Sequence, residues 1–420
     1  MDRRSFVKTS AAAFGGLMLS MHEVEALAQG TGPIKIGLLA PLTGVVAAGG
    51  KEIVEGFNLY WTQVGGKVAG RDIRVLVEDD GSNPDIALQK ARKLVEQEGV
   101  AFLIGDLLAN TGLAVAEYAK RNGVPYFMPV VAADDLTQRA RVPNVLRVAG
   151  YTASQMSRPL ADWAYRKKNL RKIVTVSQDY TFGYEQCGGF AQVFTGLGGK
   201  IVGQFWNPLN TQDFSPYIAQ IQSAAPDAVF AMETGADANR FIQQWASFGM
   251  KDKIPLMGAQ NFTDQSVIRT LGPEVDGIVS SAHFAEGNPI PATQKFVSDY
   301  QAAYKKLPSL YGFSFYSAAM WLAQAMQAVN GQVEDRQKFL AAVREVTLTN
   351  SPLGRPVHLD AYGNPVYDVY IRQVAKKPGG GYWNVPLDTY PQVSQFWSYK
   401  PDDYLKQPSY SRTFQGVGKV

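Results

Sequence analysis

The sequence has only one cysteine and three histidines in 420 residues, and this scarcity excludes several kinds of chemistry. Cys187 has no cysteine partner within the chain, so no internal disulfide can form and stability must come from the core. Its helix-like surroundings, with no histidine nearby, favour an inert thiol over a nucleophile. His283 and His358 lack the spacing of zinc ligands, and the chain has no nucleophile elbow or phosphate-binding loop. Catalysis is therefore disfavoured, and we expect no metal or cofactor.

The chain also lacks a strong charge bias and, beyond its N-terminus, any apolar run of membrane-spanning length. Its formal net charge is +4, and no basic run with interleaved aromatic residues is present. Nucleic acid is therefore not an expected partner. At 420 residues the chain is long for one hydrophobic core and suggests about two domains.

The N-terminus has the pattern of an export signal. Arg3 and Arg4 precede a short apolar stretch and a small-residue site ending at Ala28, as in twin-arginine signals. An ordinary N-terminal helix or a membrane anchor is the alternative, but the apolar part is short for a hydrocarbon core about 30 Å thick. We expect residues 1–28 to be removed and the mature chain to be periplasmic.

Downstream, short apolar segments alternate with longer amphipathic ones, which is typical of a parallel sheet covered by helices on both faces. The same rhythm starts again after residue 150. The fold class is therefore α/β, with two doubly wound lobes, and ligands on such sheets bind outside the carboxyl ends of the strands. The expected strands are 34–42, 72–80, 100–106 and 124–130, and the expected helices are 50–64, 83–97, 111–123 and 313–331.

Two short segments have a structural interpretation. GLGGK (196–200) follows a helix, as a C-cap and turn would. EDDGSNPD (78–85) lacks the alternating acids and closing glutamate of a calcium loop and predicts a capped, solvated loop. Within it, Asn83 and Pro84 form a cap and first helical turn.

Four segments resemble the leucine/isoleucine/valine-type periplasmic binding proteins, which are receptors feeding ABC importers. They are KIGLLAPLTGVVAAGGKEIVEGFNLYW, GRDIRVLVEDDGSNPDIALQKARKLVEQEGVAFLIGD, NTQDFSPYIAQIQSAAPDAVFAMETGADANRFIQQ and QKFVSDYQAAY. The resemblance runs from about residue 33 to about residue 360 in register, so it is more specific than any short motif.

The resemblance implies two lobes that close over a small ligand and are joined by three chain crossings with a central cleft. The crossings fall near Gly150, near Gly277 to Ala282 and near Gly354. Lobe 1 would comprise 33–149 and 283–354, and lobe 2 would comprise 150–282 and 355–420. The implied partner is an inner-membrane ABC permease, with a chemosensor as the alternative, and the chain is expected to be a monomer.

The resemblance also implies where the ligand binds. In an amino-acid receptor of this family, a serine, a threonine and a glutamate stand at the places of Ala109, Ala132 and Gln260, and the glutamate receives the ammonium group. Three polar groups, including the only charge, are therefore absent. The expected ligand-binding residues are Ala109, Asn110, Thr111, Val130, Val131, Ala132, Phe182, Thr234, Gln260 and Tyr311.

This pocket composition predicts the class of ligand. Burying an ammonium group without an anionic partner costs several kcal/mol, whereas the rings of Phe182 and Tyr311 favour a flat apolar body. A helix start at Asn110 and Thr111 can hold a carboxylate. The sequence therefore predicts a small apolar or aromatic carboxylic acid.

Two alternatives stay open at this point. A branched-chain or other hydrophobic amino acid is one, with Glu233, Asp237 or Asp106 as the ammonium partner. An enzyme exported by the twin-arginine pathway is the other, although no motif supports it.

Overall fold

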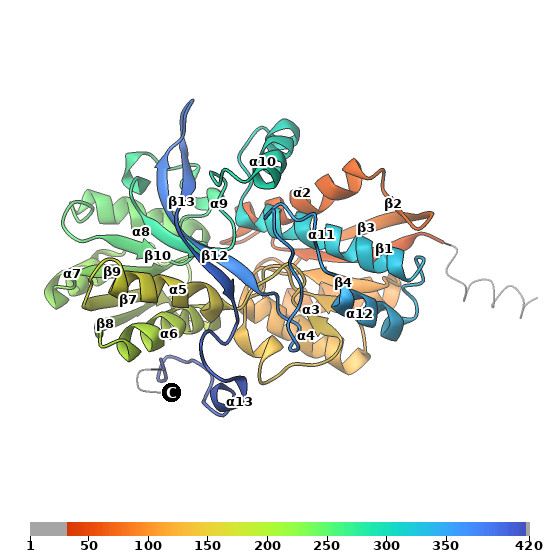
Figure 1. Ribbon diagram of the computed structural model, residues 1–420, viewed down its shortest axis with the longest axis horizontal. Helices are drawn as coiled ribbons and strands as arrows, with labels where there is room; N and C mark the ends of the chain where they lie inside the picture. The colour runs from red at the N-terminus through yellow and green to blue at the C-terminus, as the bar shows by residue number, and fades with distance from the viewer. Residues whose placement is uncertain (1–31, 417–420) are drawn as a thin grey trace, which may run out of the picture.

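The computed structural model describes residues 32–416, so the expected export signal at 1–28 lies outside the described residues. Two sheets lie side by side along the long axis of the molecule (Figure 1). The first sheet has the order β2-β3-β1-β4-β5-β6 and the second the order β13-β12-β11-β10-β9-β7-β8.

The strands of the first sheet are β1 (Ile34–Ala40), β2 (Lys67–Val68), β3 (Arg71–Asp79), β4 (Phe102–Gly105), β5 (Tyr126–Phe127) and β6 (Val145–Leu146). Those of the second are β7 (Lys172–Gln178), β8 (Lys200–Asn207), β9 (Ala228–Met232), β10 (Leu256–Gly258), β11 (Val279–Ala282), β12 (Tyr367–Lys376) and β13 (Tyr382–Val393). Neighbours are parallel from β3 through β6 in the first sheet and from β8 through β11 in the second. The antiparallel pairs among these strands are β2 with β3, β11 with β12 and β12 with β13. The predicted α/β class is confirmed.

Helices cover both sheets. With the first sheet lie α2 (Ala47–Gln63), α3 (Pro84–Arg92), α4 (Ala109–Asn122), α10 (Pro291–Tyr304), α11 (Leu310–Ala328) and α12 (Arg336–Glu345). With the second lie α5 (Ala153–Arg166), α6 (Thr181–Gly196), α7 (Ser215–Ala224), α8 (Gly235–Ser247), α9 (Gln265–Ile268) and α13 (Pro401–Tyr404). None of the helices within residues 32–416 is both long enough and apolar enough to cross a membrane.

The predicted cap and turn signals act locally as expected. Asn83 Oδ1 accepts hydrogen bonds from the N–H groups of Asp85 at 2.9 Å and Ile86 at 3.2 Å, so α3 starts where the sequence indicated. At GLGGK, α6 ends at Gly196 and the turn uses Gly198 at a φ of +101°. The predicted solvated loop is wrong for Asp80, because that side chain is completely buried and burial raises its pKa to about 6.

Aromatic residues join helices to the sheets. Phe339 of α12 packs against Phe102 and Phe127, with ring centroids 5.4 and 5.9 Å apart. In the second sheet, Phe190 of α6 stacks on Phe230 of β9 at 4.5 Å. These contacts fix helices on the faces and leave the strand ends free to carry a site.

The described chain passes between the two sheets after β6, after β11 and before β12. Residues 277–282, expected to hold the second crossing, instead include β11, whose Val279 and Ser280 pair with β10. The chain therefore leaves the second sheet only after Ala282. The lobe boundaries given by the sequence stay a prediction.

Candidate functional site

One small cavity lies where the carboxyl ends of the parallel strands of both sheets meet. Residues that follow the ends of β4, β5, β6, β7, β9 and β10 line it, together with one residue from the first turn of α11. Such strand ends are where open α/β sheets bind ligands. We call this space the interlobe cavity; its lining residues are Leu107, Val130, Tyr151, Tyr180, Phe182, Thr234, Asn261 and Tyr311.

The interlobe cavity is narrow. Its volume is about 10 Å³, within about 260 Å³ of empty space that includes open solvent. None of the eight lining side chains carries a formal charge at neutral pH. The lining therefore suits an apolar body held by a few hydrogen bonds.

Three phenols supply half of the polar side-chain atoms in the lining. Tyr151, Tyr180 and Tyr311 are only 2%, 9% and 4% exposed. Burial raises the pKa of all three, and the proximity of Tyr151 and Tyr180 further raises the pKa of Tyr311. The three phenols line the same cavity and stay protonated at neutral pH, so each can donate a hydrogen bond to an acceptor.

Carboxylates from both sides hold the start of α11, which carries Tyr311. Glu52 of α2 accepts a hydrogen bond from the Ser309 N–H at 2.9 Å, and Asp264 at the start of α9 accepts one from the Leu310 N–H at 2.7 Å. Glu52 also pairs with Arg269 at 2.5 Å. Negative groups at a helix N-terminus are favourable, so these contacts fix Tyr311 in place.

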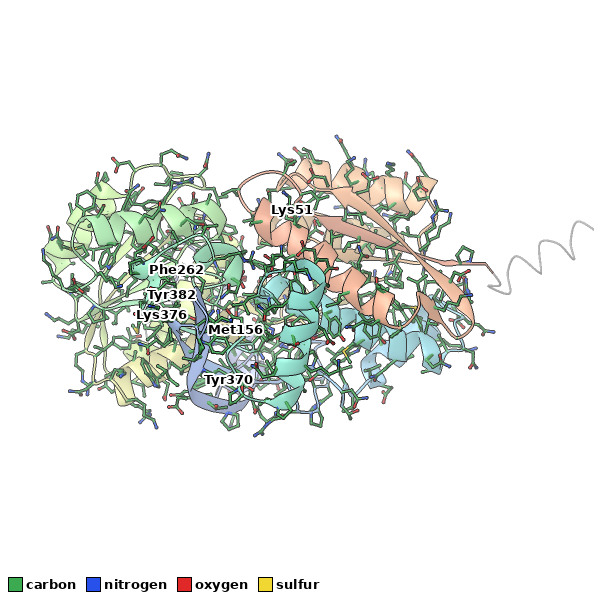
Figure 2. The ribbon with its side chains drawn as sticks, turned by 90° about the horizontal axis from the view of Figure 1, so that it is seen from above. Lys51, Met156, Phe262, Tyr370, Lys376 and Tyr382 are labelled. Atoms are coloured by element: carbon green, nitrogen blue, oxygen red, sulfur yellow. The ribbon has the colours of Figure 1, made fainter. Side chains whose placement is uncertain are left out.

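Two local features shape the walls of the cavity. Gly49 of α2 faces the Tyr311 ring so closely that a Cβ at that position would lie 2.8 Å from it. The turn that presents Asn261 is anchored by the completely buried Phe262, labelled in Figure 2, and by a 2.8 Å hydrogen bond from Asn261 Nδ2 to the Glu233 carbonyl. A larger residue at Gly49 would overlap with the ring and force it to move.

Four of the predicted ligand-binding residues line the interlobe cavity, namely Val130, Phe182, Thr234 and Tyr311. The other six do not. Ala109, Asn110 and Thr111 form the first turn of α4, where Asn110 Oδ1 accepts a hydrogen bond from the Thr111 N–H at 3.1 Å and the Thr111 hydroxyl donates to the Leu108 carbonyl at 2.8 Å. Two donors expected to meet a carboxylate are thus already used within the turn.

The remaining three predicted residues are buried beside the cavity. Val131 packs against Gly112 of α4, where a Cβ would lie 2.3 Å from a Val131 methyl carbon. The Ala132 carbonyl accepts a hydrogen bond from the Ala153 N–H at 2.9 Å. Gln260 is completely buried next to Tyr151, and its carbonyl accepts a hydrogen bond from Arg372.

Sequence reasoning missed Leu107, Tyr151, Tyr180 and Asn261. Each follows the end of a strand by five residues or fewer, and Asn261 adjoins the predicted Gln260. Position after a strand end was therefore the signal that could have found them.

The three acids considered as ammonium partners are already engaged or buried. Asp237 accepts hydrogen bonds from Gln178 at 2.5 Å and the Asn210 N–H at 2.8 Å and pairs with Arg240. Asp106 accepts a hydrogen bond from the Tyr126 hydroxyl at 2.7 Å. Burial raises the pKa of Glu233 well above its usual range, which favours its neutral form.

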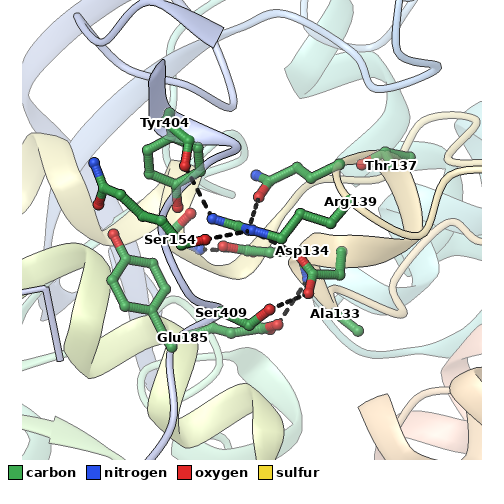
Figure 3. Close-up of polar contacts among 12 residues, drawn as sticks. Ala133, Asp134, Thr137, Arg139, Ser154, Glu185, Tyr404 and Ser409 are labelled. Carbon is green, nitrogen blue, oxygen red and sulfur yellow. Dashed lines mark hydrogen bonds and ion pairs between the residues drawn. The ribbon is translucent and has the colours of Figure 1, made fainter. Parts of the chain in front are cut away.

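A second cluster of polar residues connects the segments on either side of the chain crossing after β6 with α6 and with the C-terminal segment (Figure 3). Glu185 accepts a hydrogen bond from the Asp134 N–H at 2.9 Å, and Asp134 accepts one from the Ser154 N–H at 3.2 Å. Arg139 donates to the Tyr404 carbonyl at 3.1 Å. Burial raises the pKa of Asp134 and Glu185. We therefore interpret this cluster as a structural one that holds these segments together.

Cys187 is completely buried on α6, and burial raises its pKa to about 12. A thiol with this pKa is almost wholly protonated at neutral pH and is a poor nucleophile. The burial and raised pKa therefore support the predicted inert thiol.

His283, which follows β11, gives a testable pH dependence. It stacks on Tyr367 at 4.7 Å and lies 5.0 Å from Tyr151, and burial, with Arg372 nearby, lowers its pKa from 6.5 to about 3. The neutral form is favoured in the folded state, so its contribution to stability is present above pH 6.5 and falls as the pH drops toward 3. We expect this residue alone to lower the free energy of unfolding by about 1.4 kcal/mol between about pH 7.5 and about pH 5.5.

Urea unfolding of the wild type and of a His283→Phe variant at these two pH values measures this contribution. Asp264, whose pKa burial raises to about 6, acts in the opposite direction but equally in both proteins. The wild type should lose about 1.4 kcal/mol more than the variant on acidification. Equal losses would show that His283 is not held neutral.

The geometry can be set beside that of known proteins. A family described as periplasmic binding protein matches residues 33–380. An ABC transporter substrate-binding protein from Sphaerobacter thermophilus is 32% identical, with a TM-score of 0.81, covering 86% of this chain and 99% of that one. A solute-binding protein of an ABC transporter from R. palustris, in complex with benzoate, is 33% identical, with a TM-score of 0.80 and coverage of 86% and 98%.

A relative from Brucella abortus is named for a different class of ligand. The Leu/Ile/Val-binding protein homolog 6 of Brucella abortus is 28% identical over 378 residues, which are 89% of this chain and 95% of that protein. The family match spans most of the chain, and the site lies where two α/β lobes meet at their strand ends. The chain therefore belongs to the periplasmic binding protein family and is similar to substrate-binding proteins of ABC transporters.

Proposed function

We propose that this protein captures a small aromatic or apolar carboxylic acid in the periplasm and presents it to an ABC permease in the inner membrane. The observation that carries the proposal is the lining of the interlobe cavity, which combines apolar side chains with three neutral phenols and no charge. Apolar walls take the body of the acid, and phenol hydroxyls donate to its carboxylate.

The place of the carboxylate differs from that predicted by sequence. The first turn of α4 uses the Thr111 N–H and hydroxyl internally, so it offers fewer donors than expected. Tyr151, Tyr180 and Tyr311 lie close together and line the cavity itself. We therefore assign the carboxylate to the phenol hydroxyls.

An α-amino acid fits this cavity less well. An ammonium group buried without an anionic partner costs several kcal/mol, and no acid lines the cavity. Asp237 already pairs with Arg240, and Glu233 favours its neutral form. Benzoate binding by the R. palustris relative supports the same choice.

A branched-chain amino acid is the second candidate. The Brucella abortus relative carries a Leu/Ile/Val-binding name, and an apolar cavity also accommodates a branched side chain. Glu233 would have to ionise to receive the ammonium group.

A thermal-shift screen of amino acids, aromatic acids and aliphatic acids tests the proposal. At a ligand concentration of about 100 times Kd, the folded state should gain about 2.7 kcal/mol, and benzoate-type acids should give the largest shift. Benzamide is the matched control, because it keeps the ring and removes the negative charge.

The largest shift from leucine, isoleucine or valine, with none from aromatic acids, would contradict the acid proposal. Mass spectrometry of each mixture after incubation separates a receptor from an enzyme, because a receptor returns its ligand unchanged. Export through the twin-arginine pathway belongs to the same proposal and rests on Arg3 and Arg4, which lie outside the described residues.

A further inference from the structure

A second, larger cavity lies at the opposite edge of the second sheet. Its floor contains the amino ends of β10 and β11, whereas the interlobe cavity lies beyond the carboxyl end of β10. The space that can hold the centre of a water molecule is about 500 Å³. This volume is in the range of small-molecule sites, so the cavity is large enough for a ligand of its own.

Two tryptophans form its walls. Trp163 of α5 and Trp245 of α8 belong to the hydrophobic clusters on opposite faces of the second sheet. They are 6% and 2% exposed, so their rings are held by packing. The cavity is therefore lined by one indole side chain from each of the helices α5 and α8, whose places are seen in Figure 1.

The floor of this cavity is apolar. Leu256 and Met257 of β10 and Ile278 before β11 line it, and these side chains are 8%, 3% and 5% exposed. Flat aromatic compounds bury large areas against such surfaces and stack on rings. The walls and floor together therefore favour a ligand that is flat and apolar.

The rim carries charges of both signs. Lys168 and Lys251 supply two positive charges, and Asp252 and Asp276 two negative ones. Within the part of the chain that the structure describes, none of the four forms an ion pair. A charged ligand would therefore be attracted by two of these side chains and repelled by the other two. This rim favours an uncharged ligand whose polar groups form hydrogen bonds with it.

We propose that this second cavity binds a flat, uncharged aromatic compound, at the same time as the acid occupies the interlobe cavity. The two cavities differ in the class of ligand that they favour. The interlobe cavity offers neutral hydrogen-bond donors to an anion, whereas the second cavity has aromatic and apolar lining residues and equal numbers of positive and negative charges at its rim. The second site does not depend on the identity of the acid.

Calorimetric titration with 2-naphthol, which is uncharged at neutral pH, tests the proposal. We expect one site per chain, with the same Kd in the absence and presence of saturating benzoate. Trp163→Leu should raise that Kd about tenfold, because a stacking ring is lost. Trp383→Leu is the matched control. Lys168 Nζ lies 5.0 Å from the Trp163 ring centroid and Lys377 Nζ lies 6.0 Å from that of Trp383, but Trp383 does not line the cavity.

A second variant keeps the proposal testable if Trp163→Leu fails to fold. Leu170, half-buried in the loop after α5, lines the cavity at the edge of the core, so Leu170→Trp should fill the cavity. This variant should lose most 2-naphthol binding and keep its thermal shift with benzoate. Competition between benzoate and 2-naphthol, or unchanged 2-naphthol binding in Leu170→Trp, would overturn the proposal. Failure of benzoate to bind would overturn only the proposed acid specificity.

Discussion

Replacing Tyr151 with phenylalanine is expected to weaken benzoate binding about ten- to hundredfold. A hydrogen bond to a charged group contributes about 1.5–3 kcal/mol, and the change removes one such donor while keeping the ring. Tyr180→Phe and Tyr311→Phe should act in the same direction, because both residues line the interlobe cavity together with Tyr151. Calorimetry on each variant measures the change in Kd.

Tyr118→Phe is the matched control. Its hydroxyl donates to Glu96 at 3.0 Å, and Tyr118 lies on α4 outside the lining of the interlobe cavity. Benzamide should lose less affinity than benzoate in all three cavity variants, because a neutral acceptor gains less from each donor. If all three bind benzoate within about twofold of the wild type, the phenols do not hold the carboxylate. The first turn of α4, with Asn110 and Thr111, would then be the better candidate.

Gly56→Ala is expected to destabilise the protein by about 3 kcal/mol or more. A Cβ at Gly56 of α2 would lie 2.0 Å from the carbonyl oxygen of Gly312 and 2.7 Å from its Cα. Both are backbone atoms of α11, so one helix must move to relieve the overlap, and closely packed interiors resist such movement. Urea unfolding at neutral pH measures the loss.

Gly196→Ala is the control for this change. Gly196 ends α6, and a Cβ there meets no atom within 4 Å. Because alanine favours a helix over glycine, this variant should match or slightly exceed the wild type in stability. Gly56→Ala should also weaken benzoate binding, since Gly312 adjoins Tyr311. A change in stability below about 0.5 kcal/mol would mean that α2 and α11 do not pack this closely.

Local signals in the sequence were sufficient for much of the fold. Alternating apolar and amphipathic segments predicted two parallel α/β units, and Asn83 predicted the start of α3 from its own side-chain chemistry. Val130, Phe182, Thr234 and Tyr311 were found from the family resemblance, and they line the cavity. These features depend on neighbours within a few residues, or on a register that a long alignment preserves.

Contacts between residues distant in the sequence could not be predicted from these local signals or from the family resemblance. Whether the donors of Asn110 and Thr111 are open to a ligand depends on how the first turn of α4 satisfies its own polar groups. The closeness of Tyr151, Tyr180 and Tyr311 depends on two sheets meeting at their carboxyl ends.

The sequence by itself determined the class of fold, the parallel strands, the inert cysteine and the uncharged character expected of the pocket. Only the tertiary structure decided which polar groups face the ligand. Glu52 and Asp264, far apart in the chain, both accept hydrogen bonds from N–H groups at the start of α11. Asp237 forms an ion pair with Arg240 and is therefore not available to a ligand. The physical reason is that burial and pairing set the charge and availability of a side chain, and both arise from residues distant in sequence.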